Sequence, residues 1–224
     1  MSMSLDAALE LTRTGDIWVF RGRSGADRAI QLTTNSPVNH VGMAVVLEDL
    51  PPLMWHAELG RSLPDMWSGT HQRGVQLHDL RDAVCVWGNR YGQRAWLRQL
   101  DPPATRDMEN AALRTIARLD GTPFPSTAQL FWRWARGRVP QVRLPRPGHR
   151  SPGGSPAADD AQQRRLETAY CAEVVAVTYE EMGLLPAGRR PNWYDPGRFW
   201  SGDDLRLAGS AGLGAEIEVA IPRR

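Results

Sequence analysis

The sequence predicts an α+β fold in which an antiparallel sheet packs against a few helices. Three observations indicate this class. Residues 40–47 (HVGMAVVL) form an apolar, β-branched run of strand length. Residues 105–119 carry apolar side chains at helical spacing. The apolar positions after Cys171 trace a further helix that should end at Gly183.

The strands are predicted from short apolar runs that turns separate. The run 40–47 is almost continuously apolar, so we expect it to be buried on both faces of a sheet. The turn at 48–52 joins it to the run 53–59, and the two should form a hairpin. The other strand candidates are residues 17–20, 75–77, 83–87 and 215–222.

Helices are predicted from apolar spacing and from capping residues. Thr105 is a suitable N-cap for the helix at 105–119, because its hydroxyl can accept a backbone N–H bond. Shorter helices are expected at residues 3–13, 25–34 and 126–136.

The composition of the 224 residues is that of a globular protein, with 42% apolar and 23% charged side chains. This length fits one domain, so we expect a single domain over residues 1–224. Residues 137–160 are rich in Pro, Gly, Ser and Arg and have no period, which predicts a flexible insertion. The formal net charge is only +2, and we expect no nucleic-acid partner.

The N-terminal residues show no basic segment followed by an apolar one, and no run approaches the ~20 apolar residues that span a bilayer. A cytoplasmic location is therefore expected. The two cysteines, Cys85 and Cys171, do not indicate a disulfide framework. Cys85 sits in the apolar run AVCVW and is expected to pack in the core.

Cys171 is the candidate nucleophile. A catalytic cysteine needs a low pKa, a base within reach and a group that orients the base. We expect Cys171 near the start of its helix, where unpaired backbone N–H groups favour a thiolate and can stabilise an oxyanion. His40, at the beginning of its strand, is the candidate base. His56 and Glu58 share one face of the next strand, and either could orient His40.

Four segments, taken in order, resemble the circularly permuted papain-like cysteine hydrolases. These include the YiiX-type branch of the NlpC/P60 proteins and the related lecithin:retinol acyltransferase-like proteins. The resemblance covers about half of the chain and includes its His-Val-Gly and Tyr-Cys-Ala-Glu motifs. The matching segments are GDIWVF (15–20), DRAIQLTTNSPVNHVGMAVV (27–46), LMWHAEL (53–59) and YCAEVVAVTYEEMGLL (170–185).

This resemblance implies a fold, an activity and roles for individual residues. It implies a permuted papain-like fold, with Cys171 as nucleophile and His40 as base. For the third position His56 is the better match, because it precedes Ala57 as relatives have it, and Glu58 stays a candidate. The implied reaction cleaves an amide or ester through a thioester acyl-enzyme, without a cofactor or metal. The implied substrates are a peptide, a peptidoglycan-type amide or a lipid acyl group.

Two other functions stay open. One is a lipid acyltransferase or thioesterase at a membrane surface, because the aromatic segment 131–134 and the arginine-rich loop after it could make peripheral membrane contact. The other is a non-catalytic binding module of the same fold. Three aromatic residues are candidates for lining a substrate pocket, namely Tyr170, Trp193 and Trp200.

The histidines give little support for a metal site or for further catalytic groups. A zinc site built from His40, His56 and Cys171 is conceivable, but no closely spaced pair of ligands supports it. Three histidines lie in polar surroundings and are expected at the surface, namely His71, His78 and His149.

Overall fold

A large mixed sheet forms the centre of the molecule. The computed structural model describes residues 2–22, 37–122, 170–187, 194–201 and 205–223. All neighbouring strands of the sheet run antiparallel except β1 and β9, which are parallel. Its seven strands are, in spatial order, β1 (Met3–Ser4), β9 (Ile217–Ala220), β6 (Arg94–Arg98), β2 (Ile17–Arg21), β3 (His40–Val45), β4 (Leu53–Glu58) and β5 (Gly74–Asp79).

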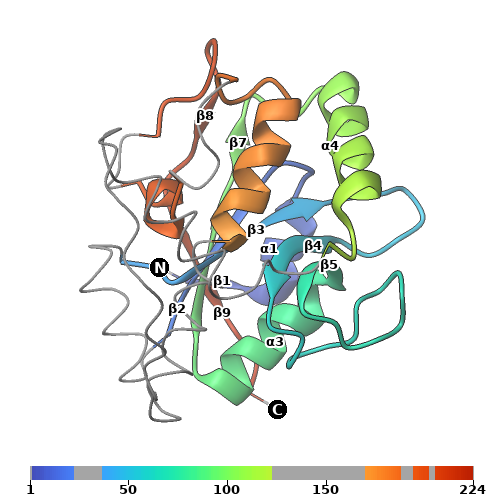
Figure 1. The fold of residues 1–224 in the computed structure, drawn as a ribbon. Coiled ribbons are helices and arrows are strands. Elements are labelled where there is room, and N and C mark those ends of the chain that lie inside the picture. Colours follow the sequence, from blue (N-terminus) through green and yellow to red (C-terminus); the bar gives the residue numbers. More distant parts are fainter. Residues whose placement is uncertain (1, 23–36, 123–169, 188–193, 202–204, 224) are drawn as a thin grey trace, which may run out of the picture.

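The sheet separates two layers of helices (Figure 1). On one face pack α4 (Arg106–Leu119) and a helix whose described residues are 170–181. On the other face pack α1 (Leu5–Leu11) and α3 (Leu80–Tyr91). The smaller elements are a ribbon of β7 (Leu100–Asp101) with β8 (Gly212–Leu213) and the short 3-10 helix η2 (Pro196–Phe199). This arrangement of one sheet with helices confirms the predicted α+β class.

The alternation of side chains along β3 assigns each residue to one layer. Val41, Met43 and Val45 belong to the core under the 170–181 helix, and Ala44 belongs to the core under α3. Every residue of β3 is buried, and β4 pairs with it as the predicted hairpin partner. Gly42 is required on the α3 side, because a Cβ there would meet the sulfur of Met54 at 2.2 Å.

The N-terminal ends of α1 and α4 follow from their capping residues. The hydroxyl of Ser4 accepts the N–H of Ala7, and that of Thr105 accepts the N–H of Met108. Both helices confirm the sequence prediction within two residues.

The prediction of a strand at 83–87 is wrong, because these residues lie in α3. The carboxylate of Asp79 caps this helix by accepting the N–H of Asp82. Gly92 ends it in the left-handed conformation, at φ +64°. A short apolar run is compatible with either a strand or a buried helix. Here the capping residues Asp79 and Gly92 mark the ends of a helix.

The helix at 170–181 is fixed to the sheet by two buried hydrogen bonds. The indole Nε1 of Trp55 donates to the hydroxyl of Thr178 at 3.0 Å. The hydroxyl of Tyr179 donates to the carbonyl of Gly15 at 2.5 Å. The helix ends before Gly183, as the sequence predicts, and Gly183 has the left-handed conformation, with a φ of +74°.

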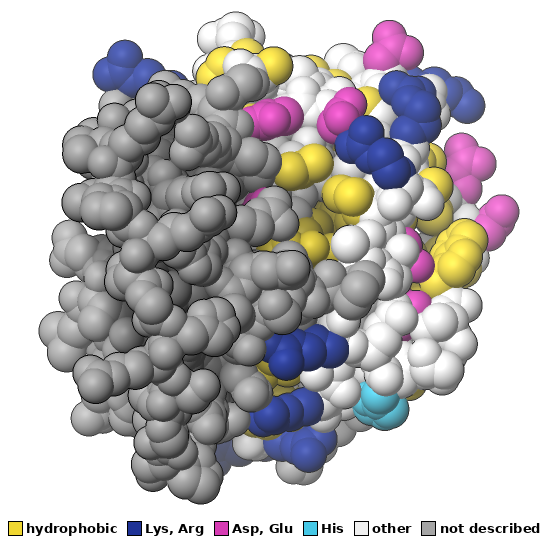
Figure 2. Space-filling view, in the orientation of Figure 1, with side chains coloured by type: hydrophobic (Ala, Val, Ile, Leu, Met, Phe, Trp, Pro, Cys, Tyr) yellow, Lys and Arg dark blue, Asp and Glu magenta, His cyan; other side chains and the backbone are white. Residues whose placement is uncertain are grey.

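Several predicted segments lie outside the described residues, namely the helices at 25–34 and 126–136 and the insertion at 137–160. No helix in the described part of the chain is long and apolar enough to cross a membrane. On the face of the molecule in Figure 2, basic and acidic side chains are interspersed over the described surface.

Candidate functional site

Three histidines on neighbouring strands form a hydrogen-bonded row on the α3 side of the sheet. His40 is the first residue of β3, His56 lies on β4 and His78 lies on β5. Nε2 of His40 is 3.2 Å from Nδ1 of His56. Nε2 of His56 is in turn 3.0 Å from Nδ1 of His78. The row exists because strand neighbours place same-face side chains next to each other.

The row ends at the side chain of Gln76, two residues before His78 on β5. Oε1 of Gln76 lies 3.1 Å from Nε2 of His78. Nε2 of Gln76 donates toward three backbone carbonyls, those of Gln72 at 3.0 Å, Gly74 at 3.3 Å and Glu58 at 3.5 Å. The amide is therefore held by its nitrogen, with its oxygen directed at the imidazole.

An aromatic side chain of α3 covers the row. The ring centroid of Trp87 is 4.5 Å from that of His40 and 5.0 Å from that of His56, both edge to face. Phe20 of β2 adds a second edge contact to His40, at 6.0 Å. His40 keeps 5% of its surface and His56 is 0% exposed under these rings, and His78 is likewise 0% exposed.

Burial keeps all three imidazoles neutral. It lowers the pKa of His40 to about 3 and that of His78 to about 4, and it lowers the pKa of His56 as well. A positive charge on His78 would disfavour protonation of His40 and His56 further. A neutral imidazole has one N–H donor and one bare nitrogen, so each ring of the row can donate at one nitrogen and accept at the other.

Glu58 lies beside the row but bonds elsewhere. Its carboxylate accepts bonds from the hydroxyl and the N–H of Ser62. The side chain of Trp87 donates to it as well, and burial raises the pKa of the carboxyl. Of the two candidates for the residue that orients His40, the one in hydrogen-bond contact with it is therefore His56.

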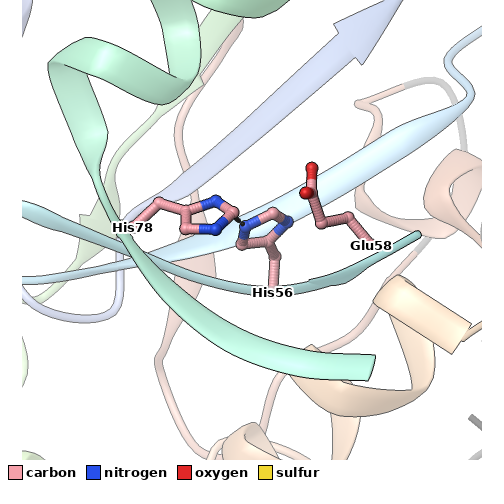
Figure 3. A group of neighbouring side chains, drawn as sticks. All are labelled: His56, Glu58 and His78. Atoms are coloured by element: carbon pink, nitrogen blue, oxygen red, sulfur yellow. Dashed lines mark hydrogen bonds between the residues drawn. The ribbon is translucent and has the colours of Figure 1, made fainter. Parts of the chain in front are cut away.

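One group of described side chains could hold a metal ion. Single ligand atoms of His56, Glu58 and His78 all lie within 4.8 Å of one another. Figure 3 shows these three side chains. Imidazole and carboxylate are suitable zinc ligands. This group shares His56 with the zinc site considered from the sequence, but it includes neither His40 nor Cys171. In the structure the two imidazoles are joined by the hydrogen bond drawn in Figure 3.

Cys171 lies in the other layer. Its side chain is 0% exposed and belongs to the core between the sheet and the 170–181 helix. Neither it nor Cys85 is in a disulfide. Because residue 169 is outside the described part, the start of this helix is not defined. The structure thus brings His40, His56 and Glu58 together and places Cys171 across the sheet from them.

Two of the three candidate pocket residues belong to the core around Cys171. Tyr170 is buried in this core. Trp200 is half-buried, packs against the same core and lies edge to face on Trp96 at 5.3 Å. Trp193 lies outside the described residues.

The expectation that His78 is a surface residue is wrong. Polar sequence neighbours suggested exposure, but β5 directs both Gln76 and His78 inward, under α3. The alternation of β5 was the available signal, since it puts Gln76 and His78 on one face. His71 is exposed as expected, and His149 is outside the described residues. Cys85 is buried as expected, although it lies in a helix.

Comparison with solved structures finds a similar chain. The chain resembles metalloprotein yiiX from Escherichia coli O157:H7, with a TM-score of 0.48 and 17% sequence identity. The match covers 95% of this chain and 99% of that one. No protein family and no curated protein matches the sequence.

Proposed function

We propose that this chain is a cysteine-dependent hydrolase of amide or ester bonds, with Cys171 as nucleophile, His40 as base and His56 as the residue that orients His40. The observation that carries the proposal is the bond between Nε2 of His40 and Nδ1 of His56. It holds the base by one nitrogen and leaves Nδ1 of His40 without a hydrogen bond among the described residues. A general base needs this combination of a fixed ring and an open acceptor atom.

The reaction follows from these groups. Nδ1 of His40 takes the proton of the Cys171 thiol, and the thiolate attacks the carbonyl carbon of the substrate. The carbon–heteroatom bond then breaks, and His40 returns the proton to the leaving amine or alcohol. Water attacks the resulting thioester, giving a carboxylic acid and the free thiol. The thiolate raises the pKa of the imidazole beside it, which offsets the effect of burial on His40.

The proposal requires the Cys171 thiol and Nδ1 of His40 to meet. His40 is the first residue of β3, so its ring lies at the end of the strand. It is also the most exposed of the three histidines in the row. The proposal has the thiol reach the ring around this end of β3, because β3 is paired with β2 on one side and with β4 on the other.

The substrate class within this reaction type is a peptide, a peptidoglycan-type amide or a lipid acyl group. The motif resemblance of the His40 and Cys171 segments supports all three equally. Incubation of the protein with one representative of each class, followed by chromatography of the products, selects among them.

The test is to trap the acyl-enzyme. The protein is treated with p-nitrophenyl acetate, quenched in acid, and its acetylated residues are mapped by peptide mass spectrometry. We expect an acetyl group on Cys171 that forms faster than on Cys85 and that the His40→Ala variant slows. His71→Ala, which removes an exposed histidine, serves as the control. No preference for Cys171 over Cys85 would overturn the proposal and favour a non-catalytic binding module.

A second candidate function rests on a separate observation. The ligand atoms of His56, Glu58 and His78 lie within 4.8 Å of one another and could hold a divalent ion that activates water. Equilibrium dialysis of the protein against zinc, followed by elemental analysis, tests this candidate. Binding of one equivalent that His78→Asn abolishes, together with hydrolysis that persists in Cys171→Ala, would favour it over the thiol mechanism.

A further inference from the structure

We propose that Gln76 and His78 are positioning residues that place the proton of all three histidines on Nε2 and thereby keep Nδ1 of His40 a bare acceptor. The inference rests on the proposed function, because it explains how His40 is kept ready to act as a base. It adds two residues that lie beyond His56 and have no contact with the reacting atoms.

The direction of the row is set at Gln76. Its amide nitrogen faces the carbonyl oxygens of Gln72, Gly74 and Glu58, at 3.0, 3.3 and 3.5 Å. Turning the amide over would put its oxygen against these three oxygens, and each of them would lose a donor. The buried amide therefore has one satisfied orientation, with Oε1 facing His78.

This orientation determines the proton on each ring in turn. Oε1 of Gln76 can only accept, so Nε2 of His78 carries its proton and Nδ1 of His78 is bare. That bare atom accepts from Nε2–H of His56, which leaves Nδ1 of His56 bare. Nδ1 of His56 then accepts from Nε2–H of His40, and the free lone pair is on Nδ1 of His40.

The acceptor at the end of the row, Oε1 of Gln76, is what fixes the direction of the chain. Without an acceptor at the end of the row, a reversed chain would satisfy the bonds between the rings equally well. In the reversed chain Nδ1 of His40 carries the proton, and the ring cannot accept another one there.

A metal ion bound to Nε2 of His56 would have the opposite effect. It would replace the proton there and move it to Nδ1 of His56. That Nδ1–H would point at Nε2 of His40 and force the His40 proton onto Nδ1. Binding of a divalent cation to this nitrogen and a base-competent His40 would therefore exclude each other.

The test reads the tautomers directly. The full-length protein is labelled with ¹⁵N-histidine and freed of metal by chelation, and long-range ¹H–¹⁵N spectra are recorded at neutral pH. We expect the pattern of the Nε2–H tautomer for His40, His56 and His78. Assignment comes from single His→Gln variants, with the exposed His71 as the reference for a ring outside the row. An Nδ1–H pattern at His40 in the unaltered protein would overturn the inference.

Two variant pairs separate positioning from mere packing. Gln76→Met keeps the size of the side chain but removes the acceptor, and should give His40 a mixed tautomer. Gln72→Met is its control, because the Gln72 side chain is not part of the row. His78→Leu removes Nδ1 of His78, the acceptor of His56, and should also give His40 a mixed tautomer. His78→Asn offers an oxygen in place of this nitrogen and should restore the Nε2–H tautomer of His40. Equal spectra for Leu and Asn at position 78 would overturn the inference.

The acetylation assay keeps this inference distinct from the proposed function. Gln76→Met should slow acetylation of Cys171 by about 10-fold or more, because general-base catalysis contributes roughly 100- to 10,000-fold. If all three histidines show the Nε2–H tautomer but Cys171 is not acetylated, the cysteine mechanism is wrong and the inferred positions of the protons stand. If Cys171 is fully acetylated but the histidines show mixed tautomers, the inferred positions are wrong and the mechanism stands.

Discussion

The two faces of the central sheet are built from the same strands and differ in chemistry. On the side of the 170–181 helix, β3 and β4 present Val41, Met43 and Trp55 to an apolar core that also contains Cys171. On the side of α3, the same two strands present His40 and His56. The difference teaches that one face is wholly apolar at these positions, whereas the other, which has its own apolar core, also buries imidazoles. Most buried polar groups in proteins are hydrogen-bonded, as the rings of this row are to one another.

The largest expected effect comes from the polar face. His40→Ala should lower the acetylation rate of Cys171 by about 100- to 10,000-fold, because it removes the general base. The measurement is the rate of acetyl transfer from p-nitrophenyl acetate, followed by mass spectrometry. Urea unfolding of the same variant shows that it is folded. An unchanged acetylation rate in the folded His40→Ala variant would show that the face with the histidines does not contribute to the reactivity of Cys171.

The second effect tests the apolar face at the neighbouring position. Trp55→Ala should lower the free energy of unfolding by about 3–5 kcal/mol, since it empties a fully buried site and removes the bond to Thr178. Urea denaturation measures this loss. Trp67→Ala is the matched control, because Trp67 is 78% exposed and its removal should cost little. Equal losses for the two tryptophans would contradict the structural role of this face.

The third effect is a pH dependence of stability that the buried histidines of the polar face produce. The folded pKa values of His40 and His78, about 3 and about 4, lie below the ordinary value of 6.5. Below pH 6.5 the unfolded chain therefore binds protons that the folded chain does not. The contribution of these rings to the free energy of unfolding is fully present above pH 6.5. It is lost as the pH falls from 6.5 toward the folded pKa values.

Urea unfolding of chelator-treated protein between pH 8 and pH 4 measures this loss. His78→Asn removes one of the titrating rings and should give a flatter curve. Equal curves for the unaltered protein and His78→Asn would show that the ring of His78 does not contribute to this pH dependence.

The smallest of these effects concerns the bond between helix and sheet. Thr178→Val keeps the shape of the side chain but leaves the indole N–H of Trp55 buried without its acceptor. The expected loss is about 1–3 kcal/mol in urea denaturation. Thr122→Val serves as a control, because no side-chain bond of Thr122 occurs among the described contacts. A loss no larger than in this control would show that the bond contributes nothing net.

The sequence predicts the frame of this fold better than its polar details. The runs at 40–47 and 53–59 predict β3 and β4, because continuous apolar stretches between turns specify buried strands. The run AVCVW is misread as a strand, since periodicity over five residues does not separate the two structures. The position of Cys171 relative to the sheet depends on which face the helix covers, and no local pattern contains this.

The candidate site is predictable in part for the same reason. His40 and His56 are found from their places on two strands that form a hairpin. His78 and Gln76 are missed, because β5 pairs with β4 after a long connection whose register only the fold decides. Trp87 is missed because its helix is missed.

The central claim is that the Cys171 thiol works with Nδ1 of His40, although the two lie on different sides of β3. The direct measurement is a crystal structure of the protein whose Cys171 has been trapped as a stable acyl adduct. The account predicts the sulfur within about 4 Å of Nδ1 of His40, with Nε2 of His40 still bonded to His56. A sulfur that remains in the apolar core beneath the 170–181 helix, out of reach of the imidazole, would contradict it.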